Sequence, residues 1–325
     1  MELIDKMLAG NEQSLARLIT LVEREAAEVP EIMSCIYPNL GNAYSVGFTG
    51  PPGAGKSSLV DRLTAAMRGK GFTVGIVACD PSSPFSGGAV LGDRIRMQQH
   101  YVDKGVFIRS LATRDSQGGL SRAARGVVKL MDASGKDFVL VETVGVGQTE
   151  LDVVEAADTT VVVLVPEAGD AIQTMKAGLL EIADIFVVNK ADRDGADSLV
   201  SELEKMLHQS PKQEWWEVPV LMTQAVKDVG TEELLQSIQK HQEALAQSGR
   251  LALHRQRQRK REFLQTIQQR LVARILRLIE KDGGLAASLE GVEKGEIDPY
   301  SASMEILSNK KLLHHWLAEL EGKEN

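Results

Sequence analysis

A glycine-rich stretch at residues 50–58 constrains the fold of this chain more than any other feature. It fits the pattern Gly, four residues, Gly-Lys-Ser. An apolar run suited to a strand precedes it at 44–49, and apolar residues at helical spacing follow it. Strand, glycine loop and helix is the context in which backbone N–H groups surround phosphate oxygens. We therefore predict a nucleotide phosphate site formed by Gly50, Pro51, Pro52, Gly53, Ala54, Gly55, Lys56, Ser57 and Ser58.

Two side chains of this stretch have predicted chemical roles. Lys56 would reach the β- and γ-phosphates, and the Ser57 hydroxyl would be a ligand of Mg²⁺. An ordinary glycine turn is the alternative, but the spacing and both flanks favour the phosphate loop.

Composition excludes several classes of protein. The chain has 325 residues and a net charge of −8, whereas a dedicated nucleic-acid-binding protein is usually basic. Its two cysteines, Cys35 and Cys79, are too few for a disulfide framework and form no zinc pattern. No apolar run approaches the ~20 residues that cross a bilayer, and the first residues do not look like a signal peptide. We expect a cytoplasmic protein that binds neither nucleic acid nor membrane.

From residue 44 onward, short apolar segments alternate with stretches of helical periodicity. This alternation predicts an α/β fold with a mainly parallel central sheet flanked by helices. We divide the chain into a helical extension at 1–43, a nucleotide-binding domain at 44–245 and a helical arm at 246–325. The predicted strands are 44–49, 73–79, 106–110, 138–142, 160–165, 185–189 and 218–223.

Acidic residues end two of these predicted strands. Asp80 closes the second strand, and Asp93 follows a Pro/Gly/Ser-rich segment at 81–88 that cannot be regular structure. Glu142 closes the fourth strand, and Gly145 follows three residues later. Ligands of parallel sheets lie at the carboxyl ends of strands, so these acids could serve Mg²⁺ and the Gly145 N–H could meet a γ-phosphate.

The sequence Asn189-Lys190-Ala191-Asp192 follows another apolar strand. The Asp192 carboxylate can accept hydrogen bonds from both N1–H and the 2-amino group of guanine, whereas adenine offers no such pair. The Lys190 stem would pack along the base. Backbone N–H groups of Gln224, Ala225 and Val226, after the last strand, could lie near guanine O6. These features favour GTP over ATP.

The expected hydrolysis is slow. Many GTPases have Gln directly after the glycine that senses the γ-phosphate, and this Gln orients the attacking water. The present chain has Val146 there, and Gln148 lies two positions further on.

The two ends of the chain read as helices. Asn11 could cap the second helix, and Asp298-Pro299 starts the last one. The basic run 254–261 favours a solvated helix face or a surface for an acidic partner over a nucleic-acid site. Apolar residues at helical spacing over 263–279 suggest a dimerisation helix. Trp215 and Trp216 are interpreted as core or subunit contacts rather than ligand contacts.

Together, five strings resemble the MeaB/ArgK family of P-loop GTPases, the methylmalonyl-CoA mutase-associated chaperones. They are the phosphate loop, Ala-Cys-Asp-Pro-Ser-Ser at 78–83, Gly-Asp-Arg-Ile-Arg-Met at 92–97, Glu-Thr-Val-Gly-Val-Gly-Gln at 142–148, and Asn-Lys-Ala-Asp at 189–192. The similarity extends over nearly the whole length.

The resemblance implies a homodimeric, metallochaperone-type GTPase. Such a protein assists an adenosylcobalamin-dependent acyl-CoA mutase by gating cofactor loading and protecting the enzyme, and binds no B12 itself. It also implies a third switch at 167–178. Asp115 and Gln224 depart from the family pattern. The implied catalytic residues are Lys56, Ser57, Glu142 and Gly145. The implied Mg²⁺ ligands are Ser57, Asp80, Asp93 and Glu142, and the implied guanine-binding residues are Asn189, Lys190, Asp192, Gln224, Ala225 and Val226.

Two other functions remain open at this point. A GTPase that delivers nickel would need Cys/His clusters, and only Cys79 lies near the predicted switches. An ATP-dependent kinase of amino-acid transport would need a base pocket for adenine, which the 189–192 motif argues against.

Overall fold

A computed structural model describes residues 2–81, 97–113, 119–143, 157–168, 180–209, 215–281 and 283–308. The chain divides into two compact units, residues 1–255 and residues 256–325. The boundaries predicted from the sequence, at 43 and 245, stay predictions.

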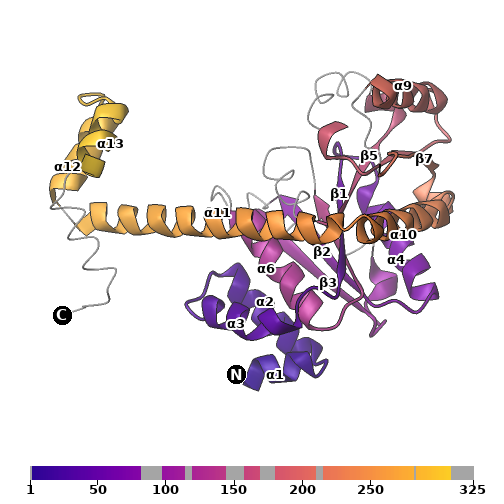
Figure 1. The fold of residues 1–325 in the computed structure, drawn as a ribbon, viewed down its shortest axis with the longest axis horizontal. Helices are drawn as coiled ribbons and strands as arrows, with labels where there is room; N and C mark the ends of the chain where they lie inside the picture. The colour runs from indigo at the N-terminus through magenta and orange to yellow at the C-terminus, as the bar shows by residue number, and fades with distance from the viewer. Residues whose placement is uncertain are drawn as a thin grey trace. The chain divides into compact units, whose positions relative to one another are not determined.

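A seven-stranded sheet lies at the centre of the first unit (Figure 1). Its strand order is β3-β2-β4-β1-β5-β6-β7, and every neighbouring pair is parallel. All seven predicted strands are present, which confirms the expected fold class. Their bounds are β1 Tyr44–Thr49, β2 Val74–Pro81, β3 Val106–Thr113, β4 Phe138–Thr143, β5 Thr159–Leu164, β6 Ile185–Asn189 and β7 Val220–Thr223.

Helices precede, connect and follow these strands. In the described part of the first unit they are α1 Glu2–Leu8, α2 Glu12–Glu23, α3 Val29–Ile36, α4 Lys56–Gly69, α6 Gly119–Ala133, α9 Ala196–Gln209 and α10 Thr231–Gln247. Helix α11, Arg250–Lys281, leads into the second unit, which also holds α12 Gly283–Glu293 and α13 Pro299–Ser308. Short 3-10 helices are η1 Tyr37–Asn39, η2 Gln98–His100, η3 Pro166–Ala168 and η4 Ala225–Lys227.

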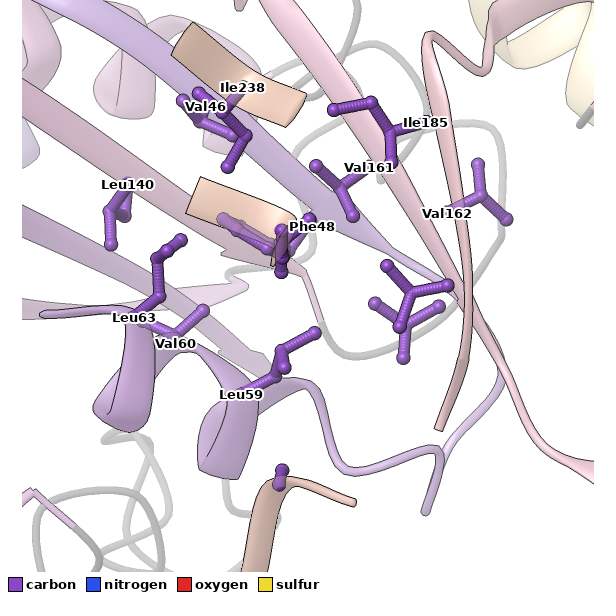
Figure 2. Close-up of a cluster of buried hydrophobic side chains, with 14 of the residues drawn as sticks. Val46, Phe48, Leu59, Val60, Leu63, Leu140, Val161, Val162, Ile185 and Ile238 are labelled. Carbon is purple, nitrogen blue, oxygen red and sulfur yellow. The ribbon is translucent and has the colours of Figure 1, made fainter. Parts of the chain in front are cut away.

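Each face of the sheet packs on its own set of helices. Side chains of a strand alternate between faces, and β4 shows this clearly. Phe138 and Leu140 join the core with α4, α9 and α10, whereas Val139 and Val141 join the core with α1, α2, α3 and α6. Figure 2 shows part of the first core, where Leu59 and Leu63 of α4 lie near Phe48 of β1. The sheet is therefore covered on both sides, as expected for parallel strands.

The N-terminal helices belong to this packing. Asn11 caps α2, because its side chain accepts a hydrogen bond from the Ser14 N–H at 2.8 Å. Leu15, Leu18 and Ile19 of α2 are fully buried against the sheet side that carries α6. The predicted packing of these helices on the nucleotide-binding domain is thus observed.

The second unit carries exposed apolar side chains along α11. Phe263, Leu264 and Leu271 are about half exposed or more. The helix extends from Arg250 to Lys281, so it begins well before the apolar periodicity that the sequence shows over 263–279. Among the described residues, no helix combines the length and the apolar character needed to cross a membrane.

A buried polar cluster lies at the amino-terminal ends of β1, β5 and β6. His241 of α10 shares a hydrogen bond of 2.8 Å with the Thr159 hydroxyl, and its other ring nitrogen lies 3.4 Å from Asp184 Oδ1. The Trp216 indole N–H donates to the Asp184 carbonyl, so this tryptophan packs in the core as predicted. Burial lowers the pKa of His241 to about 4 and raises the pKa of Asp184 to about 7, although 29% of the Asp184 side chain is exposed.

These two pKa shifts predict opposing effects of pH on stability. The pKa of Asp184 is higher in the folded state, so its contribution to the free energy of unfolding falls as pH rises from about 4 to about 7. The pKa of His241 is lower in the folded state, so its contribution rises between about pH 4 and 6.5. The Asp184→Asn variant should therefore gain stability with rising pH more steeply than the wild type in urea unfolding. The exposed Asp194→Asn serves as control, and equal slopes for all three proteins would contradict the expectation.

Candidate nucleotide site

The loop between β1 and α4 needs glycine at two positions. Gly50 has a φ of +145°, and a Cβ there would lie 2.0 Å from the Val163 carbonyl oxygen of β5. Gly55 has a φ of +88°, and a Cβ there would lie 2.3 Å from the Asn189 side-chain nitrogen. Gly53 also has a positive φ, +75°, but open space surrounds it. The loop is thus held between strands β5 and β6 at the carboxyl edge of the sheet.

This geometry predicts unequal effects of alanine in the loop. We expect Gly50→Ala to lower the free energy of unfolding by about 1–3 kcal/mol through backbone strain alone, and more through the contact with Val163. Gly53→Ala, the matched control, should cost only about 1–2 kcal/mol because it meets no neighbour. Urea unfolding of both variants checks this, and a Gly53→Ala that is as destabilising as Gly50→Ala would contradict it.

Lys56 is held across the loop. Its side chain is buried, and its ammonium group donates to the carbonyl oxygens of Gly50 at 2.7 Å and Pro51 at 3.1 Å. Lys56 also begins α4, so the positive end of the helix lies at the same loop. The loop therefore places a fixed positive charge and a helix N-terminus together, which suits an anionic ligand.

Ser57 and Glu142 meet beside the loop. The Ser57 hydroxyl donates to a Glu142 carboxylate oxygen at 2.6 Å, and both residues are buried. The register of the sheet produces this contact, because Glu142 of β4 pairs with Phe48 of β1, two residues before the loop. Hydroxyl and carboxylate oxygens are the hard ligands that Mg²⁺ prefers, so Ser57 and Glu142 fit the predicted role of metal ligands.

Asn189 joins the phosphate loop to the loop at 224–226, which the sequence predicts to lie near the guanine base. Its side-chain amide donates to the Ala54 carbonyl at 2.8 Å, and its side-chain oxygen accepts from the Thr223 hydroxyl and the Ala225 N–H, both at 3.1 Å. Asn189 is 2% exposed. Its side chain therefore sets the spacing between two loops that are far apart in the sequence. Sequence reasoning missed Thr223, which lies at the end of β7 and has no signal of its own.

Asp192 lies on the surface next to this link. Lys190 has a φ of +56°, an uncommon conformation for a residue with a side chain, and it turns the chain sharply after β6. The pKa of the Asp192 carboxyl is lowered by a hydrogen bond from its own backbone N–H and by Lys227, whose ammonium lies 3.3 Å away. Asp192 is therefore a charged and accessible acceptor at this edge. Lys227 is a second residue that the sequence reasoning did not single out.

Two of the three backbone donors predicted for guanine O6 have partners within the protein. The Gln224 N–H donates to the Val229 carbonyl at 2.9 Å, and the Ala225 N–H donates to Asn189. Contact with O6 would require these groups to change partners. Val226 is 82% exposed on the same loop.

Several predicted residues lie outside the described part of the chain. Asp93, Asp115, Gly145 and Gln148 are among them, as are residues 169–178 of the predicted third switch. Asp80 lies in β2, but its side chain is also outside the description.

The family follows from comparison with known proteins. A family model described as methylmalonyl Co-A mutase-associated GTPase MeaB matches residues 15–279. This chain belongs to the MeaB family. The family and the GTPase class that the sequence motifs predicted are thereby confirmed.

Relatives of this MeaB-family chain match over most of their length. A Pyrococcus abyssi protein is 50% identical over 311 residues, covering 94% of this chain and 95% of the relative. The Escherichia coli protein named GTPase ArgK is 37% identical, covering 79% of this chain and 80% of its own. A solved structure described as an LAO/AO transport system kinase has a TM-score of 0.70 at 29% identity, covering 94% and 95% of the two chains.

Proposed function

We propose that this MeaB-family protein binds and slowly hydrolyses GTP and acts as a chaperone of an adenosylcobalamin-dependent acyl-CoA mutase. One observation carries the nucleotide part of the proposal. The Asn189 side chain is hydrogen-bonded both to Ala54 of the phosphate loop and to Ala225 of the loop at 224–226. A single buried side chain thus fixes the two loops that a guanine nucleotide would have to contact at once.

The protein's own groups would act mainly by electrostatics. Lys56 and the N-terminus of α4 would stabilise charge on the transferred phosphoryl group. Ser57 and Glu142 would hold Mg²⁺, together with Asp80 and Asp93, and the Gly145 N–H would meet the γ-phosphate. When bound, Mg²⁺ supplies positive charge to the phosphate oxygens. Val146, in place of a water-orienting Gln, supports the slow intrinsic rate.

Base recognition would depend on Asp192. Its lowered pKa keeps the carboxylate ionised, and an ionised carboxylate accepts from N1–H and the 2-amino group of guanine. Lys190 would pack along the base, and Gln224, Ala225 and Val226 would surround O6.

The chaperone part of the proposal is supported by family membership. The family description names association with methylmalonyl-CoA mutase. A mouse relative with 33% identity, which covers 78% of this chain, is named methylmalonic aciduria type A homolog. The exposed apolar side chains of α11 support the homodimer that the family resemblance implies.

The test is GTP hydrolysis by the purified chain with and without a methylmalonyl-CoA mutase from the same cell. We expect a slow rate that rises several-fold when the mutase is added. An adenosylcobalamin enzyme that is not an acyl-CoA mutase is the matched control. No rise and no complex with any acyl-CoA mutase of that cell would contradict the chaperone role while leaving the GTPase activity intact.

A further inference from the structure

The first turns of α11 are bonded to the amino-terminal edge of the sheet. Arg255 donates to both carboxylate oxygens of Asp158, at 2.8 and 2.9 Å. The same guanidinium donates to the carbonyl oxygens of Gly41 at 2.7 Å and Ala43 at 2.8 Å. One residue earlier, the His254 ring lies 2.9 Å from the Ala157 carbonyl oxygen. Arg255 thus makes four hydrogen bonds, all within the first unit.

Asp158 carries this contact into the sheet. Its side chain is 3% exposed, and it also accepts from the backbone N–H and the hydroxyl of Ser45, both at 2.9 Å. Ser45 lies in β1, and Asp158 directly precedes β5. A bidentate contact between arginine and a buried carboxylate is strong and specific in geometry, and breaking it leaves a buried charge uncompensated. The first turns of α11 therefore hold two adjacent central strands, β1 and β5, in register.

The same two strands border the phosphate loop at their other ends. Strand β1 runs directly into Gly50, and the Val163 carbonyl of β5 lies against that glycine. Ser45 and Gly50 are five residues apart, or about 17 Å of strand. Strands β1 and β5 pair along this length, from Val46 opposite Thr159 to Thr49 opposite Val162. A short and rigid element thus connects the Arg255 contact to the phosphate loop.

Helix α11 continues from this contact without a break. It runs from Arg250 to Lys281, and the second compact unit begins at residue 256, directly after Arg255. We propose that Arg255 couples nucleotide occupancy of the phosphate loop to the helical unit 256–325. The proposal rests on the proposed function only in taking the ligand to be a guanine nucleotide.

The coupling that we propose is positive, so that nucleotide binding and the Arg255 contact stabilise each other. A bound nucleotide restricts the carboxyl ends of β1 and β5, which keeps Asp158 and Ser45 in place to receive Arg255. The hydrogen bonds of Arg255 then break less often. Coupling between sites is reciprocal. A partner that weakens or strengthens the Arg255 contact would therefore change nucleotide affinity by the same factor as nucleotide changes the stability of that contact. The alternative is an anchor that holds the helix equally in all nucleotide states.

Hydrogen exchange of the full-length protein distinguishes the two. Amides of residues 256–281 are followed without nucleotide and with saturating GDP and Mg²⁺. In the wild type we expect GDP to slow their exchange at least about fivefold. In Arg255→Gln this slowing should disappear. Arg250→Gln is the matched control, because Arg250 lies in the same first turns but stacks on Trp215 at 5.3 Å instead, and it should keep the slowing.

Each outcome decides the proposal. Equal exchange of 256–281 with and without GDP in the wild type overturns it, and so does a slowing that persists in Arg255→Gln. If β1 and β5 lose protection in Arg255→Gln, Arg255→Lys replaces it, since lysine keeps the charge but cannot make the forked contact. GDP titration in the same samples separates the two proposals: no binding by the wild type defeats the proposed function together with the coupling, whereas binding with unchanged exchange defeats the coupling alone.

Discussion

Asp192→Asn is expected to weaken binding of GDP and GTP by about 100-fold or more while ATP binding stays unchanged. The substitution replaces two acceptor oxygens with one acceptor and one donor group. Guanine would lose at least one charge-assisted hydrogen bond, each worth about 1.5–3 kcal/mol, and would meet an opposing donor. Calorimetric titration with GDP, GTP and ATP measures the change. Xanthine carries a carbonyl where guanine carries the 2-amino group, so the variant should bind xanthosine nucleotides better than the wild type does.

The control for this prediction is Asp194→Asn, the same substitution two residues away on the exposed loop. It should leave all four affinities unchanged. An Asp192→Asn protein that keeps the full preference for GTP over ATP would refute the proposal that Asp192 recognises guanine. Since Asp192 is on the surface and its ion pair with Lys227, at 3.3 Å, is exposed, loss of folding is not expected to complicate the result.

Glu142→Ala is expected to lower GTP hydrolysis by about 100- to 1,000-fold and to raise the Mg²⁺ concentration that hydrolysis requires. The reason is the 2.6 Å contact between Ser57 and Glu142, which places both oxygens where a metal ligand would act. Glu142→Asp, which keeps the charge but shortens the reach, should fall between the wild type and Glu142→Ala. Single-turnover hydrolysis across a Mg²⁺ titration gives both quantities.

GDP affinity measured without Mg²⁺ is the internal control for the Glu142 variants and should change little. The exposed Glu181→Gln should behave as the wild type. Unchanged hydrolysis at limiting Mg²⁺ in Glu142→Ala would exclude a role of this residue in the metal shell.

Features that depend on neighbouring residues were predictable from the sequence. The phosphate loop is such a feature, because strand, glycines and helix follow one another within fifteen residues and all appear in the structure. The strands were predictable because both faces of the sheet are covered, which makes each strand a continuous apolar run. The predicted last strand began too early, at 218; the structure starts it at Val220, after Pro219, which has no N–H to give to a neighbouring strand.

Contacts between distant parts of the chain were not predictable in the same way. Asn189 was expected to hold guanine, but nothing in its four-residue motif shows that its amide is bonded to Ala54 and Ala225. Arg255 is one of several basic residues in its run, and only the folded chain distinguishes it by bringing it to Asp158, 97 positions earlier. Likewise, the pairing of His241 with Thr159 and Asp184 depends on how α10 packs on the sheet.

The most direct test of the central claim is equilibrium binding and hydrolysis of GTP against ATP by the purified chain in the presence of Mg²⁺. The site predicts tight GTP and GDP binding, slow hydrolysis of GTP, and an ATP affinity at least about 100-fold weaker, because adenine leaves the Asp192 carboxylate without its two donors. Equal or better binding and hydrolysis of ATP would contradict the account and favour an ATP-dependent activity at the same phosphate loop.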